Sequence, residues 1–95
     1  RQIQGIAFYQ NWIILSQSYG SKDSKLYFFP ISALSNLDEG NAEKVVIMPP
    51  YLEQIYVQNG QLLMLFESGA KAYARDQIMI VDRILSANIN ALLGG

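Results

Sequence analysis

The side chains best suited to chemistry are two glutamates, Glu53 and Glu67, which lie on either side of an expected hairpin. Two neighbouring carboxylates can donate and accept a proton, ligate a hard cation or accept hydrogen bonds from a sugar. Alternatively, Glu67 pairs with Lys71 or Arg75 a few residues on and Glu53 is solvated. An exposed ion pair of this kind stabilises a fold by only ~0–1 kcal/mol. The sequence allows either role.

Aromatic side chains form a second candidate group. Tyr51, Tyr56 and Tyr73 could provide a surface on which a carbohydrate or another planar ligand stacks. The same rings could instead pack between layers of the fold, as large aromatic side chains usually do. Trp12 begins an apolar run, so we expect it to be a packing residue.

Two residue types that dominate enzyme and metal sites are absent, because the chain contains no His and no Cys. A Ser-His-Asp relay, an imidazole or thiolate metal site and a disulfide framework are therefore excluded. The segment 36–41 has a passing likeness to a calcium loop, but its spacing fails the EF-hand pattern and a polar turn explains it. We expect no catalytic residue, no metal and no cofactor, which favours a non-enzymatic role for this chain alone.

The charge content restricts the partners. The 95 residues include 7 Lys+Arg and 8 Asp+Glu, and 16% are charged while 51% are hydrophobic. Ordinary soluble domains are ~25% charged, so much of this surface should lie against something else. A net charge of −1 offers no basic stripe for phosphates, so we expect no nucleic-acid partner. No apolar run approaches the ~20 residues of a membrane helix.

The elements that must position these residues are strands. Short apolar blocks divided by Gly, Asn, Pro and Ser predict an all-β chain. Gln10-Asn11 and Asn59-Gly60 each lie between two apolar runs and predict tight hairpins, because Asn-Gly is a strong sequence signal for a two-residue turn. The expected strands cover residues 3–9, 12–18, 26–29, 44–48, 53–57, 62–67 and 78–86.

Two halves of the chain resemble each other. Residues 6–15 align with residues 55–64 at an offset of 49 (55 − 6), so that strand, turn and strand coincide. Residues 24–34 align with residues 82–92 at an offset of 58 (82 − 24), and the extra residues fall in a long loop at 69–81. We therefore divide the chain into a first blade-like repeat, 1–49, and a second, 50–95.

A period of this length with three or four strands per unit is typical of β-propeller blades, which have ~40–50 residues. The run Gly5-Ile6-Ala7-Phe8, a turn, Trp12-Ile13-Ile14-Leu15-Ser16 and then Lys25-Leu26-Tyr27 resembles the inner and middle strands of bacterial six- or seven-bladed propellers. These include the gluconolactonase-like and quinoprotein-like groups. Residues 48–55, 65–70 and 82–84 resemble the closing blades of uncharacterised exported propellers. The residues themselves do not indicate a location; the resemblance alone implies an extracytoplasmic one, secreted or periplasmic.

The resemblance implies about two antiparallel propeller-like blades, with the runs 13–15 and 62–66 as middle strands covered on both faces by neighbouring blades. Two blades alone would leave edges that a closed ring covers. We therefore expect a homo-oligomer, for example three chains with six blades, or the remainder of a longer or cleaved protein as the partner. The alternative is a small β-sandwich whose hairpins look alike because all hairpins follow the same rules.

In a propeller, the connections between blades share one face with the loops that join the second and third strands, and ligands usually dock on that face. A long loop in a compact domain is often functional, so the loop at 69–81 belongs to this set. The candidate ligand-binding residues that this placement brings together are Gln17, Tyr19, Tyr51, Glu53, Glu67, Lys71, Tyr73 and Arg75.

The predicted function is a non-catalytic binding or assembly module that presents loops on one face of a β-propeller, with a carbohydrate or small molecule as the candidate ligand. The competing hypothesis is a C-terminal fragment of a larger gluconolactonase-like or quinoprotein-like enzyme whose catalytic groups lie in other blades.

Overall fold

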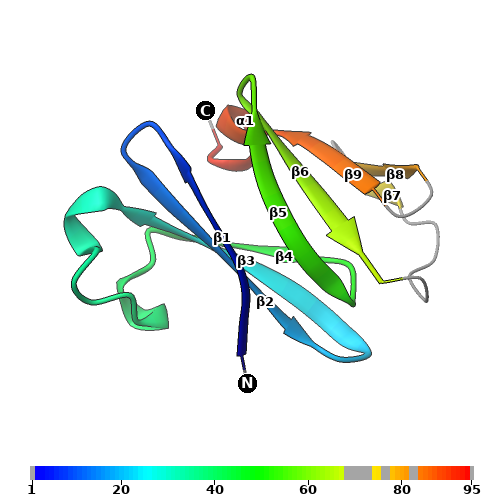
Figure 1. Cartoon of the computed structure of the whole chain (residues 1–95), viewed down its shortest axis with the longest axis horizontal. Helices are drawn as coiled ribbons and strands as arrows, with labels where there is room; N and C mark the ends of the chain where they lie inside the picture. Colours follow the sequence, from blue (N-terminus) through cyan, green and yellow to red (C-terminus); the bar gives the residue numbers. More distant parts are fainter. Residues whose placement is uncertain (1, 68–73, 76–77, 82–83, 95) are drawn as a thin grey trace.

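The short apolar blocks form two antiparallel β-sheets (Figure 1) in the computed structural model, which describes residues 2–67, 74–75, 78–81 and 84–94. Sheet A is a meander in the order β1-β2-β3-β4, and sheet B has the order β5-β6-β9-β8-β7. The predicted all-β class is confirmed. The strands are β1 (Gln2–Tyr9), β2 (Trp12–Tyr19), β3 (Lys22–Pro30), β4 (Lys44–Met48), β5 (Leu52–Gln58), β6 (Gln61–Phe66), β7 (Ala74–Arg75), β8 (Ile78–Val81) and β9 (Ile84–Asn88).

Three short helical segments complete the described chain: the 3-10 turns η1 (Ile31–Ala33) and η2 (Glu39–Asn41), and the α-helix α1 (Ile89–Leu92). The Asn88 side chain accepts a 3.0 Å hydrogen bond from the Ala91 N–H, which satisfies a free donor at the start of α1. None of the helices in the described residues is long and apolar enough to cross a membrane.

The expected strand at 78–86 is wrong in one respect, because it is two strands. β8 and β9 pair antiparallel to each other, and the charged residues Asp82 and Arg83 interrupt the apolar run between them. The region 69–81, expected to be a loop, contains β7 and β8, and the rest of it lies outside the described residues. The predicted strand 44–48 coincides with β4, whereas β3 begins four residues before the expected start at Leu26.

The predicted hairpins are confirmed. The turn between β1 and β2 has Gln10 at a φ of 53°, and the turn between β5 and β6 has Asn59 at 52° and Gly60 at 75°. These left-handed values suit Asn and Gly, because Gly lacks a Cβ and Asn tolerates this region.

The strand register of the first hairpin recurs in the second. Phe8 lies opposite Ile13 in sheet A. In sheet B, the residues 49 positions further on, Val57 and Leu62, lie opposite each other. The irregularity also recurs, because a register shift follows Ile3 in β1 and Leu52, 49 positions further on, in β5.

The third strand of each sheet continues this correspondence. Phe29 of β3 lies opposite Ile13, and Ala87 of β9, 58 positions further on, lies opposite Leu62. The backbone N–H groups just after these two strands also make equivalent hydrogen bonds. Those of residues 31 and 89 donate to the turn carbonyls of residues 11 and 60, over 2.8 and 3.0 Å.

The main core lies between the two sheets and uses one face of each. Sheet A contributes its inner face, and sheet B contributes the face that carries alternate residues of β5, β6 and β9. Trp12 packs against this core and meets Phe28 edge-on at 6.4 Å between ring centroids, which confirms its predicted packing role. The buried strand residues of this core are Ala7, Ile14, Leu26, Phe28, Met48, Leu52, Ile55, Leu62, Met64, Phe66, Leu85 and Ala87.

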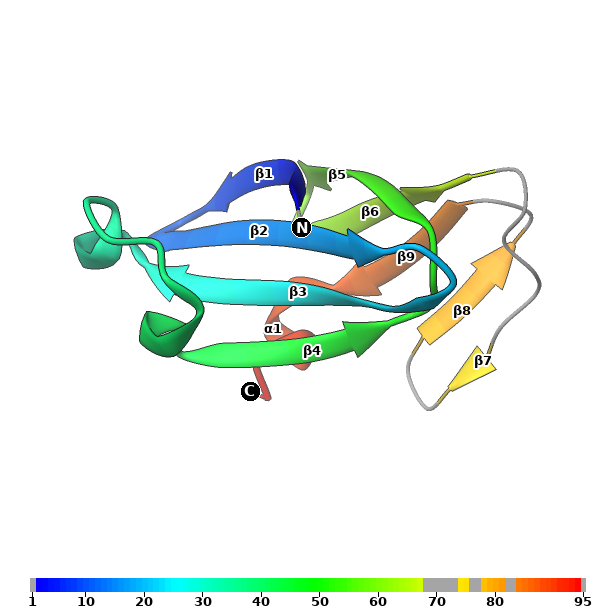
Figure 2. The same ribbon diagram turned by 90° about the horizontal axis from the view of Figure 1, so that it is seen from below.

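A second cluster lies on the outer face of sheet A. Residues 31–43, here called the cap segment, cross this face between β3 and β4 (Figure 2). Its Ala33, Leu37 and Ala42 pack over four buried side chains of β2 and β3. The run 13–15 is therefore covered on both faces, but one cover is the connection between β3 and β4 and not the neighbouring blade that the resemblance implied. The four buried residues are Ile13, Leu15, Tyr27 and Phe29.

The same prediction is wrong for residues 62–66 of sheet B. Leu62, Met64 and Phe66 are buried between the sheets, but Leu63 and Leu65 are only half-buried. The reason is that no segment among the described residues covers the outer face of sheet B in the way that the cap segment covers sheet A.

The two sheets approach most closely along their first strands, where β1 lies beside β5 (Figure 2). Gly5 makes this approach possible. A Cβ built on Gly5 would lie 3.1 Å from the Ser16 Oγ and 3.3 Å from the Ile55 Cγ1, both tighter than ordinary contacts.

Candidate functional site

Five of the eight predicted site residues lie at one end of the molecule. Figure 2 shows the end of β2, the start of β5 and the end of β6 there. Gln17 and Tyr19 belong to β2, Glu53 belongs to β5, and Tyr51 and Glu67 flank β5 and β6. Lys71 and Tyr73 lie outside the described residues, as does the side chain of Arg75 in β7.

Tyr51 and Glu67 are joined through their backbones. The Glu67 N–H donates to the Tyr51 carbonyl over 3.0 Å, and Tyr51 has a left-handed φ of 67°. Glu53 occupies the register shift of β5, and both glutamate side chains are exposed. The two carboxylates thus lie at neighbouring strand ends in solvent.

Gln17 and Tyr19 are held in a polar network with Tyr27. The Tyr19 hydroxyl donates to the Gln17 Oε1 over 2.7 Å and lies 2.9 Å from the Tyr27 hydroxyl. Gln17 is 5% exposed and Tyr27 is 4% exposed. The Lys25 Nζ lies 5.6 Å from the centroid of the Tyr19 ring, within cation-π range.

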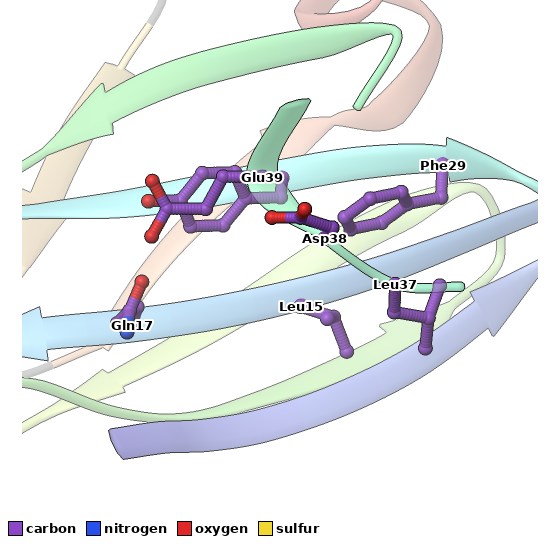
Figure 3. A pocket seen from close by; sticks show the side chains of 7 residues that line it. Leu15, Gln17, Phe29, Leu37, Asp38 and Glu39 are labelled. Atoms are coloured by element: carbon purple, nitrogen blue, oxygen red, sulfur yellow. The ribbon is translucent and has the colours of Figure 1, made fainter. Parts of the chain in front are cut away.

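This network borders a small pocket between sheet A and the cap segment (Figure 3). Its volume is about 170 Å³, below the ~300–1,000 Å³ typical of a site for a drug-sized ligand. It has room for one small polar group that the Gln17 amide and the acidic side chains could bind. The lining residues are Leu15, Gln17, Tyr27, Phe29, Leu37, Asp38 and Glu39.

The aromatic rings of this pocket do not form a stacking platform. Tyr27 and Phe29 lie 6.5 Å apart in a tilted pair, and only 4% and 1% of their surfaces are exposed. A planar ligand has no ring face to cover here. Sequence reasoning named Gln17 and Tyr19 but missed Tyr27. Tyr27 lies in β3 opposite Leu15, two residues along β2 from Gln17 and on the same face.

A second candidate surface is the outer face of sheet B, although the outer face of sheet A also exposes apolar side chains, those of Ile6, Phe8, Val45 and Ile47. Tyr56 and Ile84 are each 54% exposed on the face of sheet B, and Leu63 and Leu65 lie half-buried between them on β6. The Ser86 hydroxyl donates to the Gln61 Oε1 over 3.2 Å at its margin. The nine described positions of the face, assigned from pairing and burial, are Gln54, Tyr56, Gln58, Gln61, Leu63, Leu65, Ile84, Ser86 and Asn88.

None of these nine positions carries a charge, although the exposed Glu53 lies beside Gln54 in the register shift of β5. Along a strand with one solvated face, apolar residues that point to the core usually alternate with polar residues that point to solvent. Single exposed apolar residues are common, whereas contiguous apolar patches mark interaction sites. The sequence signal was available in the alternate uncharged residues of 54–58 and 61–65. It was missed because the run 62–66 was expected to be covered on both faces.

The described residues contain no cluster of three or more acidic side chains that could hold a metal ion. Comparison with protein-family models, with curated proteins and with solved structures found no match to this chain.

Proposed function

We propose that this chain is a non-catalytic assembly module: two blade-like units stacked head to tail, with one face left open to bind a further β-sheet. The observation that supports this most directly is the relation between the two sheets. They share a strand register at offsets of 49 and 58, yet they contact each other through opposite faces.

The faces can be compared position by position. Sheet A packs on sheet B through Ala7 and Ile14. The residues 49 positions further on, Tyr56 and Leu63, lie on the outer face of sheet B, away from sheet A. A two-fold sandwich of equivalent sheets would bring equivalent faces together, whereas a head-to-tail stack brings unlike faces together, as successive propeller blades do.

A head-to-tail stack leaves an outer face at each end, and in this chain the cap segment covers the middle strands of the one on sheet A. The other end is the outer face of sheet B, which carries Tyr56 and Ile84, each more than half exposed, with the exposed Glu53 at its edge in the register shift of β5. Burial of apolar area is the main favourable term in association. The outer face of sheet B is therefore the proposed binding surface, and the 170 Å³ pocket is not needed for it.

Light scattering coupled to size exclusion tests the proposal. The chain should elute with a mass greater than its own 10.7 kDa, with the larger fraction rising with concentration. A single-chain mass up to near-millimolar concentration would contradict assembly. It would favour the competing hypothesis of a larger propeller whose other blades cover the same face within one polypeptide.

A further inference from the structure

We propose that the cap segment, residues 31–43, is a lid: it opens from the outer face of sheet A while both sheets stay folded. Opening uncovers a face equivalent to the one through which sheet B stacks on sheet A. The stacking role of the uncovered face rests on the assembly function proposed above. The lid itself is a local property of the chain and is tested without assembly.

The side chains under the cap segment are the counterparts of residues that stack the two sheets. Ile13 and Leu15 of β2 lie under it. Their counterparts 49 positions further on, Leu62 and Met64, are buried in the core between the sheets. The cap segment therefore occupies on sheet A the place that sheet A itself occupies on sheet B. The two remaining pairs, at an offset of 58, are Tyr27 with Leu85 and Phe29 with Ala87.

The cap segment covers only part of this face. Ile6 on the edge strand β1 is 51% exposed, whereas its counterpart Ile55 is 3% exposed. The same contrast appears near the start of the cap segment, where Leu34 is 55% exposed and its counterpart Leu92 is 9% exposed. A sheet packed here as sheet A packs on sheet B would bury side chains that the cap segment leaves open. The other exposed apolar side chains of this face are Phe8, Val45 and Ile47.

The cap segment is lightly packed on the sheet. None of residues 31–43 is itself buried, and the partly buried side chains that pack on the sheet are those of Ala33, Leu37 and Ala42. The fit is incomplete, because a pocket of about 170 Å³ remains between the cap segment and sheet A beside Leu15 (Figure 3). Segments with few buried apolar contacts open at a lower free energy than the core. Opening also returns the conformational entropy of an ordered backbone.

The backbone hydrogen bonds of the cap segment suit a movement as one piece. At its start, the Ile31 N–H donates to the Asn11 carbonyl over 2.8 Å. At its end, the Glu43 N–H donates to the Phe28 carbonyl over 2.8 Å. An opening that breaks the bond at Glu43 leaves the bonds between the ends intact, because they are local. In these local bonds, each N–H donates to the carbonyl three residues back, from residues 34, 36, 41 and 42.

Thiol labelling of single-cysteine variants tests the lid, because the chain has no Cys of its own. Ile13 and Ile14 are adjacent in β2 and both are 0% exposed, but Ile13 lies under the cap segment and Ile14 lies between the sheets. Ile13→Cys and Ile14→Cys are therefore matched in residue type, strand and burial. Far-UV circular dichroism checks that each variant folds. Leu15→Cys replaces the first variant, and Leu26→Cys the second, if either does not.

Each variant is reacted with excess dithionitrobenzoate at low micromolar protein concentration. Urea unfolding gives its unfolded fraction, and hence the labelling rate that global unfolding alone allows. Ile13→Cys should react at least about tenfold faster than that rate, because the cap segment opens before the sheets unfold. Ile14→Cys should react at the global rate. Labelling of Ile13→Cys should slow at least about threefold near millimolar protein concentration, because stacking then covers the open face.

The failures separate the two proposals. Equal rates relative to global unfolding in Ile13→Cys and Ile14→Cys would overturn the lid and leave the assembly function of sheet B standing. Fast labelling of Ile13→Cys that does not slow in a protein that assembles would overturn the stacking role of the uncovered face. A single-chain mass by light scattering, together with fast labelling, would overturn the assembly function and with it the stacking role, and would leave the lid.

Discussion

Replacing Gly5 tests whether the two sheets approach as closely as the head-to-tail stack requires. Gly5 lies opposite Ser16, and an added Cβ would meet the Ser16 Oγ at 3.1 Å, the Ile55 Cγ1 at 3.3 Å and the Ile55 N at 3.4 Å. Overfilling a packed site costs roughly 1–3 kcal/mol. Ala also lowers the conformational entropy of the unfolded chain, which stabilises the folded state by ~0.4–1 kcal/mol. We therefore expect Gly5→Ala to lower the free energy of unfolding by about 1–2 kcal/mol in total.

Ser16 makes the prediction sharper, because its Oγ is the nearest obstacle. Ser16 is fully buried, and its hydroxyl has no hydrogen-bond partner among the described residues. An unsatisfied buried hydroxyl costs roughly 1–3 kcal/mol, so Ser16→Ala should leave the free energy of unfolding unchanged or raise it by up to about 1 kcal/mol. Combined with Gly5→Ala, it also removes the 3.1 Å contact. We expect the double variant to be more stable than the sum of the singles by about 1 kcal/mol.

Urea unfolding followed by circular dichroism measures all three variants. Gly40→Ala is the matched control, because no atom lies within 4 Å of a Cβ built there, and it should be neutral or slightly stabilising. If Gly5→Ala behaves like Gly40→Ala, the strands are further apart than described. If Ser16→Ala lowers the free energy of unfolding by more than about 1 kcal/mol, the Ser16 hydroxyl has a hydrogen-bond partner, and the predicted non-additivity of the double variant is wrong.

Two further predictions use matched residues and urea unfolding. Ile14→Ala should cost about 2–5 kcal/mol because Ile14 is fully buried between the sheets, whereas its register counterpart Leu63→Ala should cost the monomer less than half as much; equal costs would mean that the outer face of sheet B is covered. Tyr19→Phe should cost about 0.5–1.5 kcal/mol by removing the hydrogen bond to Gln17, and Tyr51→Phe should cost less; the reverse order would contradict the polar network.

The sequence predicted the parts of the fold that depend on neighbouring residues. The two turns form where Gln10, Asn59 and Gly60 take positive φ. The apolar run 13–15 forms a buried strand because it has no polar face to expose. Turn chemistry and local pattern decide both outcomes.

What the sequence did not predict depends on how distant segments pack. The burial of Leu15 and Tyr27 by Leu37 requires the cap segment to fold back over β2 and β3, and no local pattern in a polar connection specifies that return. The same limit applies to the site. Gln17 and Tyr19 were expected as free ligand contacts, but the Tyr19 hydroxyl bonds to Gln17 and lies beside the Tyr27 hydroxyl, and the cap segment lies over Gln17.

The cap segment also explains why sheets A and B, which share a strand register, have different outer faces. Ile13 and Leu62 occupy equivalent register positions, and both are fully buried, but the first lies under residues of its own unit and the second under the other sheet. In a repeat architecture, a terminal unit must cover the face that an interior unit gives to its neighbour. Sheet A carries such a cover and the described part of sheet B does not. The proposed stacking would therefore be directional, with the covered middle strands of sheet A at one end and the outer face of sheet B at the other.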